Sequence, residues 1–263
     1  MVTNSAFYNF LRYSAVSNSI VELLTGKTTK CKKFYASFLL DEGARNKDNR
    51  LAFDIGANKG NKTAALLDLG FSVIDLEPEK KSLSTLSWRF AKDKRVTIID
   101  KGVSDQPGVT SIFISGPRSG LNTMSSKWVD VLKNPAANRW GKKFNYQGSY
   151  EVSLTTLDEL VTQFGIPYFI KIDVEGYEHK VIKGLHHQPA FISFETNLPE
   201  FLEETIECIR HISTLSPNTI FNYSFTEALV SEHWLSAEEM LVKINDPAIR
   251  YMEIICKLEP NNA

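Results

Sequence analysis

The chain has 263 residues, of which 43% are hydrophobic and 23% are charged, the balance of an ordinary globular protein. Its 30 Lys and Arg residues are matched by 31 Asp and Glu residues, which argues against a protein whose main task is to bind nucleic-acid backbone. The cysteines Cys31, Cys208 and Cys256 lie far apart and form no CxxC pair, which predicts reduced thiols and a cytoplasmic protein. No apolar run approaches the roughly 20 residues of a membrane span.

The first half of the chain alternates between predicted helices and strands. Residues 1–47 carry apolar side chains at three- and four-residue spacings, which predicts an N-terminal helical cap. The elements expected after it are strand 51–54, helix 62–69, strand 72–76, helix 80–92 and strand 96–99. This alternation is typical of a parallel sheet with helices on both faces.

The second half repeats this alternation. Thr156 and Glu159 form a predicted capping box, and Pro199 is expected in the first turn of a helix, where its missing N–H costs nothing. The expected elements are helix 156–164, strand 168–174, helix 178–183, strand 191–194, helix 199–212, strand 219–225, a helix capped by Ser236, and strand 251–258. Residues 48–263 are therefore predicted to form one doubly wound α/β domain with a seven-stranded, mostly parallel sheet. The irregular stretch 116–148 is long for a connection and is predicted to be a functional insertion.

Acidic side chains end several of the predicted strands. In a doubly wound sheet, ligands bind beyond the carboxyl ends of the strands, so acids at these ends are predicted to meet in one polar cleft. They are Asp54, Glu77, Asp105, Asp173 with Glu175, and Glu195. Taken singly, each of them could instead be a helix cap or a solvated strand end.

The glycine turn after the first strand indicates the kind of cofactor. A dinucleotide-binding turn needs G-x-G-x-x-G so that the backbone can approach a pyrophosphate. Here the turn reads D-x-G-x-x-x-G, and Asn58 stands where the second glycine would be. Asp54 before the turn suits a ligand with an ammonium and a sulfonium and would repel a diphosphate. Glu77 is expected to accept hydrogen bonds from both ribose hydroxyls of a nucleoside.

Several strings, taken together, resemble one family. LAFDIGANKGNKT is followed by VIDLEP, GVSD, LTTLDEL, FIKIDVEGYEHKVIKG and FISFE, and from about Leu51 to Glu195 the chain resembles the FkbM-type methyltransferases that depend on S-adenosylmethionine. The resemblance implies a class I methyltransferase fold and transfer of a methyl group to oxygen, typically a hydroxyl of a sugar or a small secondary metabolite. It further implies that Ser104 and Asp105 lie near the adenine. The implied cofactor-binding residues are Asp54, Gly56, Asn58, Gly60, Glu77, Ser104 and Asp105.

Three carboxylates are predicted on the acceptor side of the reaction. An aliphatic hydroxyl is a weak nucleophile until its proton is leaving, so a base or a metal is expected. Asp173 and Glu175 alternate with apolar residues, which would place both on one face of the strand end, and Glu195 ends the next strand. We predict Asp173 as the central carboxylate, assisted by Glu175 or Glu195. Alternatively, these carboxylates and Asn197 offer the hard oxygen ligands that Mg²⁺ accepts, and spacing alone does not decide this.

The acceptor itself is less well defined by the sequence. Specificity is expected in the N-terminal helices and the insertion, where Trp128, Trp140 and Tyr146 either offer flat faces to a sugar ring or pack under the loop. The main expectation is an O-methyltransferase acting on a saccharide or small-molecule hydroxyl, without a nucleic-acid partner and with its oligomeric state open. The alternatives are a nucleic-acid methyltransferase, a nicotinamide-dependent oxidoreductase and a cofactor-binding module without turnover.

Overall fold

The main sheet has seven strands in the spatial order β3-β2-β1-β7-β8-β10-β9. The computed structural model of the chain describes residues 27–40 and 48–259. β10 runs antiparallel to both of its neighbours, and the other pairs are parallel. From one edge to the other, the strands are β3 (Val96–Ile99), β2 (Ser72–Leu76), β1 (Leu51–Ile55), β7 (Phe169–Ile172), β8 (Phe191–Asn197), β10 (Tyr251–Leu258) and β9 (Thr219–Ser224). This order, with its reversal of winding between β1 and β7, confirms the predicted class I methyltransferase fold.

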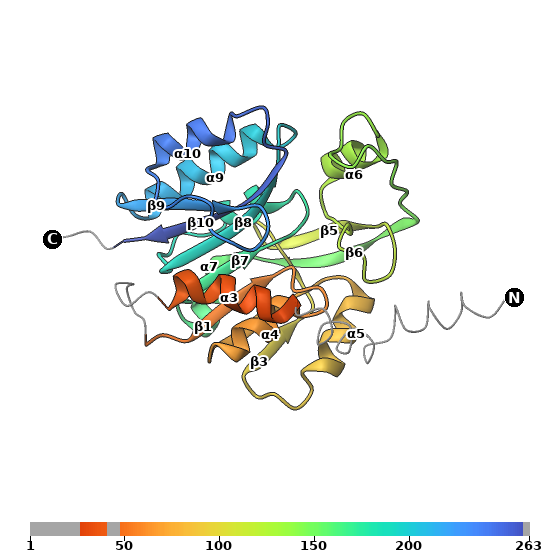
Figure 1. Cartoon of the computed structure of the whole chain (residues 1–263). Coiled ribbons are helices and arrows are strands. Elements are labelled where there is room, and N and C mark those ends of the chain that lie inside the picture. Colours follow the sequence, from red (N-terminus) through yellow and green to blue (C-terminus); the bar gives the residue numbers. More distant parts are fainter. Residues whose placement is uncertain (1–26, 41–47, 260–263) are drawn as a thin grey trace, which may run out of the picture.

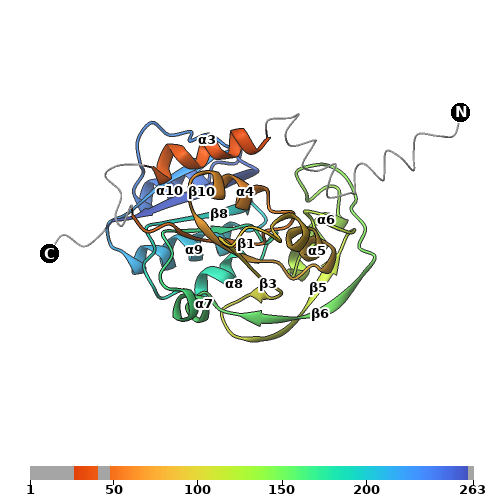
Figure 2. The ribbon, with the colours of Figure 1, turned by 90° about the horizontal axis from the view of Figure 1, so that it is seen from below.

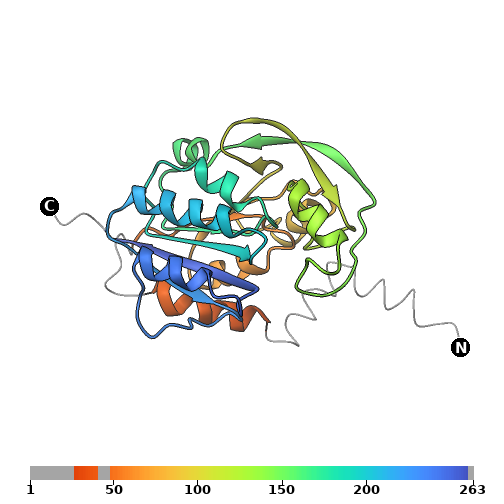
Figure 3. The same ribbon diagram turned by 90° about the horizontal axis from the view of Figure 1, so that it is seen from above.

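Helices cover both faces of this sheet, as Figure 1 shows. One face packs against α3 (Lys27–Leu39) and α4 (Asn61–Asp68), and α5 (Lys80–Arg89) lies beside the start of α4 and contacts β3. The opposite face is covered by α7 (Leu157–Phe164), α8 (Glu178–Lys183), α9 (Leu202–Leu215) and α10 (Ala237–Ile244). In Figure 3 the molecule is seen from the side of α9 and α10, which lie across this second face.

The sequence of α3 explains its position on the sheet. Its apolar residues recur at helical spacing and place Phe34, Tyr35 and Phe38 on one buried stripe. The ring of Tyr35 lies 5.3 Å from that of Phe169, and the ring of Phe38 lies 5.6 Å from that of Phe191. α3 is therefore packed against the middle of the sheet. The rest of the predicted N-terminal cap, residues 1–26 and 41–47, lies outside the described residues.

A second, three-stranded sheet lies at the side of the molecule and was not predicted. Its order is β4-β6-β5, with β6 parallel to β4 and antiparallel to β5. The strands are β4 (Gly102–Val103), β5 (Gly108–Ile114) and β6 (Gly148–Thr155), and α6 (Ser126–Lys133) lies between the last two in sequence. Figure 2 shows β5, β6 and α6 gathered on this side. The stretch expected to be an irregular insertion thus connects two paired strands.

The remaining local predictions are largely confirmed. Capping boxes begin α7 at Thr156 and α10 at Ser236. Pro199, however, precedes α9 instead of opening it: Phe201 is still non-helical, and the Leu202 N–H donates to the Pro199 carbonyl in a turn. None of the helices in the described parts of the chain has the length and hydrophobicity needed to cross a bilayer.

Candidate active site

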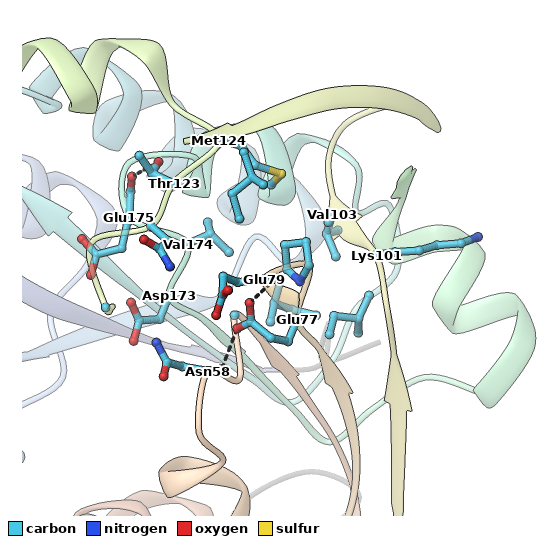
Figure 4. A pocket seen from close by; sticks show the side chains of 18 of the residues that line it. Asn58, Glu77, Glu79, Lys101, Val103, Thr123, Met124, Asp173, Val174 and Glu175 are labelled. Atoms are coloured by element: carbon cyan, nitrogen blue, oxygen red, sulfur yellow. Dashed lines mark hydrogen bonds between the residues drawn. The ribbon is translucent and has the colours of Figure 1, made fainter. Parts of the chain in front are cut away.

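Two cavities lie at the carboxyl ends of the central strands, where the winding of the sheet reverses. The first has a volume of about 620 Å³ including its open mouth. Figure 4 shows the side chains around it, which come from the ends of β1, β2 and β7, from β4 and β5 of the second sheet, and from the segment after β5. The second cavity has a volume of about 1140 Å³, also counted with its mouth, and reaches toward α3, β8 and β10.

The glycine turn forms one wall that both cavities share. Gly56 has φ +83°, and a Cβ atom there would lie 2.0 Å from the carbonyl oxygen of Asp173. Asn58 has φ +51°, a left-handed conformation that Asn tolerates better than most residues. Only glycine at position 56 therefore allows the ends of β1 and β7 to approach each other this closely.

Glu77 is buried at the end of β2 and faces the first cavity. Its side chain is held by two backbone donors, the N–H groups of Asn58 and Glu79, each 2.7 Å away. Burial raises the pKa of Glu77 to about 7, although these two donors lower it. The carboxylate is thus fixed in orientation, and its oxygens retain lone pairs for a ligand.

The other predicted cofactor residues separate into different positions. Gly56, Asn58 and Glu77 line the first cavity. Asp54 lies beneath it, fully buried, and Gly60 fits against α5, where a Cβ would lie 2.3 Å from the Phe90 ring.

Ser104 and Asp105 are not among the residues lining the first cavity. The Asp105 carboxylate forms an ion pair with Lys180 of α8 at 3.2 Å. Ser104 lies close to Gly184, because a Cβ atom on Gly184 would be 2.5 Å from the Ser104 carbonyl oxygen. At Ser104 and Asp105 the chain therefore runs toward α8 and away from the first cavity. Gly102 and Val103 line the cavity instead, so the expected contact of Ser104 and Asp105 with adenine rests on the sequence resemblance alone.

A largely buried ion cluster adjoins the two cavities, and two of its members, Lys171 and Asp173, line the second. The Lys171 ammonium on β7 is 2.8 Å from the Asp173 carboxylate and 3.6 Å from that of Asp54. The Lys171 side chain is 3% exposed and that of Asp54 is 0% exposed, whereas Asp173 is 25% exposed and lines both cavities. Asp54 also accepts a hydrogen bond from Thr63. Asp173 is therefore the accessible end of an otherwise buried network.

The second cavity is lined by both acidic and basic side chains. Glu195 on β8 and Glu253 on β10 line one wall. Lys62 at the start of α4 also lines the cavity and is 3.0 Å from Glu227. Burial raises the pKa of Glu253, while the charge of Lys62 opposes this rise. The cavity is thus polar but carries nearly balanced charge.

Glu175 has a different place from the one predicted. β7 ends at Ile172, and Glu175 adopts φ +56°, so the expected strand alternation with Asp173 does not occur. Its carboxylate accepts a hydrogen bond of 3.1 Å from the Trp128 indole of α6 and lines the first cavity. Burial and the charge of Asp173 raise its pKa well above the usual value. Glu175 thus connects α6 to the first cavity.

The aromatic residues of the insertion pack among themselves. Trp128 is 1% exposed and its ring lies 6.1 Å from that of Trp140 and 5.6 Å from that of Phe201. The Tyr146 hydroxyl donates to the Leu121 carbonyl. Of the two expectations, packing under the loop is the one observed for Trp128.

The magnesium alternative finds no support. Within residues 27–40 and 48–259, no three His, Cys, Asp or Glu side chains are grouped so that they could hold a metal ion. Asn197, the fourth expected ligand, is not among the residues lining either cavity.

Comparison with known proteins identifies the family. The sequence profile described as Methyltransferase FkbM domain matches residues 54–224, a stretch that begins at Asp54 and contains every residue that lines the first cavity. The chain belongs to the FkbM methyltransferase family. No curated protein matches this FkbM methyltransferase.

Several solved structures match most of the chain at very low sequence identity. The precorrin-6y C5,15-methyltransferase from Geobacter metallireducens is 11% identical, with 86% of this chain and 87% of that chain covered and a TM-score of 0.41. The plantazolicin methyltransferase BpumL, solved in complex with SAH, is 9% identical, with coverage of 95% and 93% and a TM-score of 0.44. A putative RNA methyltransferase from Pyrococcus horikoshii is 10% identical, with coverage of 88% and 83% and a TM-score of 0.40.

Sequence reasoning missed several residues that shape the site of this FkbM methyltransferase. Lys171 interrupts an otherwise apolar strand two positions before Asp173, and this was a signal for a buried ion pair. Glu253 likewise stands within an apolar strand and pointed to a polar position on the sheet. Lys62 and Tyr251 gave no such signal, because only the packing of α4 and β10 brings them to the second cavity.

Proposed function

We propose that this methyltransferase transfers a methyl group from S-adenosylmethionine to a hydroxyl of a saccharide or a small molecule. The observation that carries the proposal is that the two cavities meet at Asp173, Gly56, Asn58 and Gly120, which line both. A donor and an acceptor bound on the two sides of this boundary would be neighbours, and holding two reactants in line is a large part of catalysis.

The first cavity has the properties that S-adenosylmethionine requires. The fixed carboxylate of Glu77 suits the two ribose hydroxyls, and the apolar Leu76, Val103 and Ile112 in the lining suit a flat base. Asp173 supplies negative charge toward a cationic ligand. When bound, S-adenosylmethionine would provide a methyl group activated by a positively charged sulfur.

The second cavity supports a neutral, hydroxyl-rich acceptor. Hydroxyl groups both donate and accept hydrogen bonds, so a lining that contains both carboxylates and ammonium groups can satisfy several of them at once. Tyr251 and Phe225 add ring surface to the same cavity, which suits the apolar face of a sugar. A nucleic-acid acceptor would call for an excess of basic residues, and the whole chain has a formal net charge of −1. A cytoplasmic location also remains part of this proposal.

Binding and transfer assays test the proposal in two steps. Calorimetry with S-adenosylhomocysteine measures the cofactor site, and tritiated methyl transfer into a panel of monosaccharides, oligosaccharides and phenolic or aliphatic alcohols measures the acceptor site. A folded protein that binds neither S-adenosylmethionine nor S-adenosylhomocysteine would refute the cofactor assignment. Transfer only to amines or to nucleic acid would refute the hydroxyl acceptor.

Asp173→Asn provides the sharpest variant. We expect unchanged affinity for S-adenosylhomocysteine and a turnover lowered roughly 10- to 100-fold, because the variant keeps the shape of the shared wall but loses a charged hydrogen-bond acceptor for the acceptor hydroxyl. The control is Asp130→Asn on the exposed face of α6, which should leave both quantities unchanged. Full activity of Asp173→Asn would show that the acceptor-side chemistry lies elsewhere.

A further inference from the structure

Two glutamates oppose each other across the β8–β10 pair in the wall of the second cavity. Glu195 and Glu253 are register partners, and directly opposed side chains of antiparallel strands lie on the same face, with Cβ atoms about 4.5–5.5 Å apart. Both residues line the second cavity, and Glu253 is only 5% exposed. Two negative charges at this spacing repel each other, and burial removes much of the water that would screen them. The pair therefore favours holding a proton.

Charged groups from the neighbouring elements act on Glu195. Asp173 after β7 adds a further negative charge, whereas Lys171 on β7 and Lys62 on α4 bring positive charge. The Tyr251 hydroxyl on β10 is hydrogen-bonded with Glu195. Burial first, and then the charges of Asp173 and the opposing glutamate, raise the pKa of Glu195 to about 8. Glu195 thus takes up and releases a proton near neutral pH, where a general base is most effective.

Asp173 is in a different situation. Its carboxylate lies 2.8 Å from the Lys171 ammonium, which is buried in the sheet. The same ammonium lies 3.6 Å from Asp54, so the Asp173 carboxylate is held in place by a buried partner. Asp173 is therefore suited to accept a hydrogen bond from an acceptor hydroxyl and to orient it.

These observations indicate a different role for each of the carboxylates. Resting on the function proposed above, we infer that Glu195 removes the acceptor's proton, that Glu253 acts as a positioning residue behind it, and that Asp173 orients the acceptor. In this step the acceptor O–H bond breaks and its proton passes to Glu195. The freed oxygen forms a bond to the methyl carbon, and the carbon–sulfur bond breaks with its electron pair remaining on sulfur.

Titration of the glutamate carboxyls by NMR tests this assignment of roles, and it needs no acceptor. In the full chain labelled with ¹³C at glutamate carboxyls, we expect one resonance that titrates near pH 8 and is missing in Glu195→Gln. In Glu253→Gln its midpoint should fall by about one pH unit or more, because removing a negative neighbour favours the ionised form of Glu195. Asp173→Asn removes another negative neighbour and should shift the midpoint in the same direction, which provides a second variant should Glu253→Gln not fold.

The control is Glu203→Gln in the first turn of α9, an exposed position that should leave the midpoint unchanged. A Glu195 resonance that titrates in the ordinary carboxylate range, or that does not respond to either variant, overturns the inference. Unchanged affinity for S-adenosylhomocysteine in Glu253→Gln shows that the cofactor site is intact, so this result is separable from a failure of the proposed function.

The rate of methyl transfer provides the second readout. It is measured with the acceptor, from the panel of saccharides and alcohols described above, that is methylated fastest. The rate of methyl transfer by Glu195→Gln should be lower than that of the wild type on the order of 10²–10⁴-fold at every pH. In Glu253→Gln the acid limb of the pH–rate profile should move to lower pH. A Glu195→Gln enzyme with the wild-type rate would assign the proton transfer to another group.

Discussion

Lys171 is a buried cation in the middle of the main sheet, placed between two acidic residues. Burial lowers its pKa, but the charges of Asp173 and Asp54 outweigh this and raise the pKa of Lys171 above its usual value. A buried ion pair contributes little net stability, because removing its members from water is costly, yet removing one member leaves the other charge buried without compensation. The two aspartates thus depend on Lys171 far more than the pair's net stability would indicate.

Lys171→Met should lower the free energy of unfolding by about 3–5 kcal/mol, because Asp54 would remain buried without its cation. Urea denaturation measures this. Adding Asp54→Asn to the same chain should restore part of the loss, since the second change removes the uncompensated charge. Lys127→Met breaks an exposed pair with Glu204 and should cost no more than about 1 kcal/mol. Equal losses in the two lysine variants would contradict the argument.

Glu77 should make cofactor affinity dependent on pH. Its pKa of about 7, raised by burial, means that the carboxylate gains a proton as the pH falls through neutrality and then accepts fewer hydrogen bonds from ribose. Affinity for S-adenosylhomocysteine should therefore weaken below about pH 7. Glu77→Gln should bind roughly 10- to 100-fold more weakly at pH 8, the equivalent of about 1.5–3 kcal/mol for a charged hydrogen bond, and should lack this pH dependence.

Calorimetry across this pH range measures both effects. Glu151→Gln, an exposed change on β6, serves as the matched control and should follow the wild-type curve. A Glu77→Gln protein with wild-type affinity at pH 8 would remove Glu77 from the ribose site.

Among the secondary-structure elements, the close approach of β1 to the end of β7 depends on the absence of a side chain at Gly56. Gly56 and Gly70 have nearly the same backbone conformation, φ +83° and +87°, but a Cβ at position 70 would meet no atom within 4 Å. Gly70→Ala should therefore cost only the left-handed conformation, about 1–2 kcal/mol. Gly56→Ala adds the clash with the Asp173 carbonyl and should cost clearly more.

Comparing the two alanine variants by urea denaturation and calorimetry separates conformational strain from the clash. We expect Gly70→Ala to bind S-adenosylhomocysteine normally, and Gly56→Ala to lose binding because the strand ends are forced apart. If both variants lost the same stability and bound equally well, the close approach of the two strands would be unimportant for the site.

At the scale of the whole molecule, the main sheet could be predicted because its strands and helices carry strong local signals. Thr156 and Ser236 were expected as helix caps and are observed as such. The second sheet escaped prediction because β4 has only two residues, and because β5 and β6 pair across a long intervening segment. Such pairing depends on tertiary contacts, for which short strands give little warning.

The candidate site, like the fold, could be predicted from the sequence only in part. Asp173 and Glu77 were expected from their positions at strand ends, and both line the first cavity. The contents of the second cavity could not be inferred, because Tyr251 and Glu253 reach it only through the placement of β10 between β8 and β9. Sequence order gives no hint that the last described strand is inserted beside an earlier one.

This placement of β10 has a consequence for biosynthesis. Among the described residues, all those that line the first cavity precede position 176, whereas the second cavity is lined by Tyr251 and Glu253 as well. A growing polypeptide that has left the ribosome only as far as β9 thus holds all the residues for the first cavity, but part of the wall for the second is still missing. Insertion of β10 between β8 and β9, both made earlier, is the event that supplies this part of the second cavity.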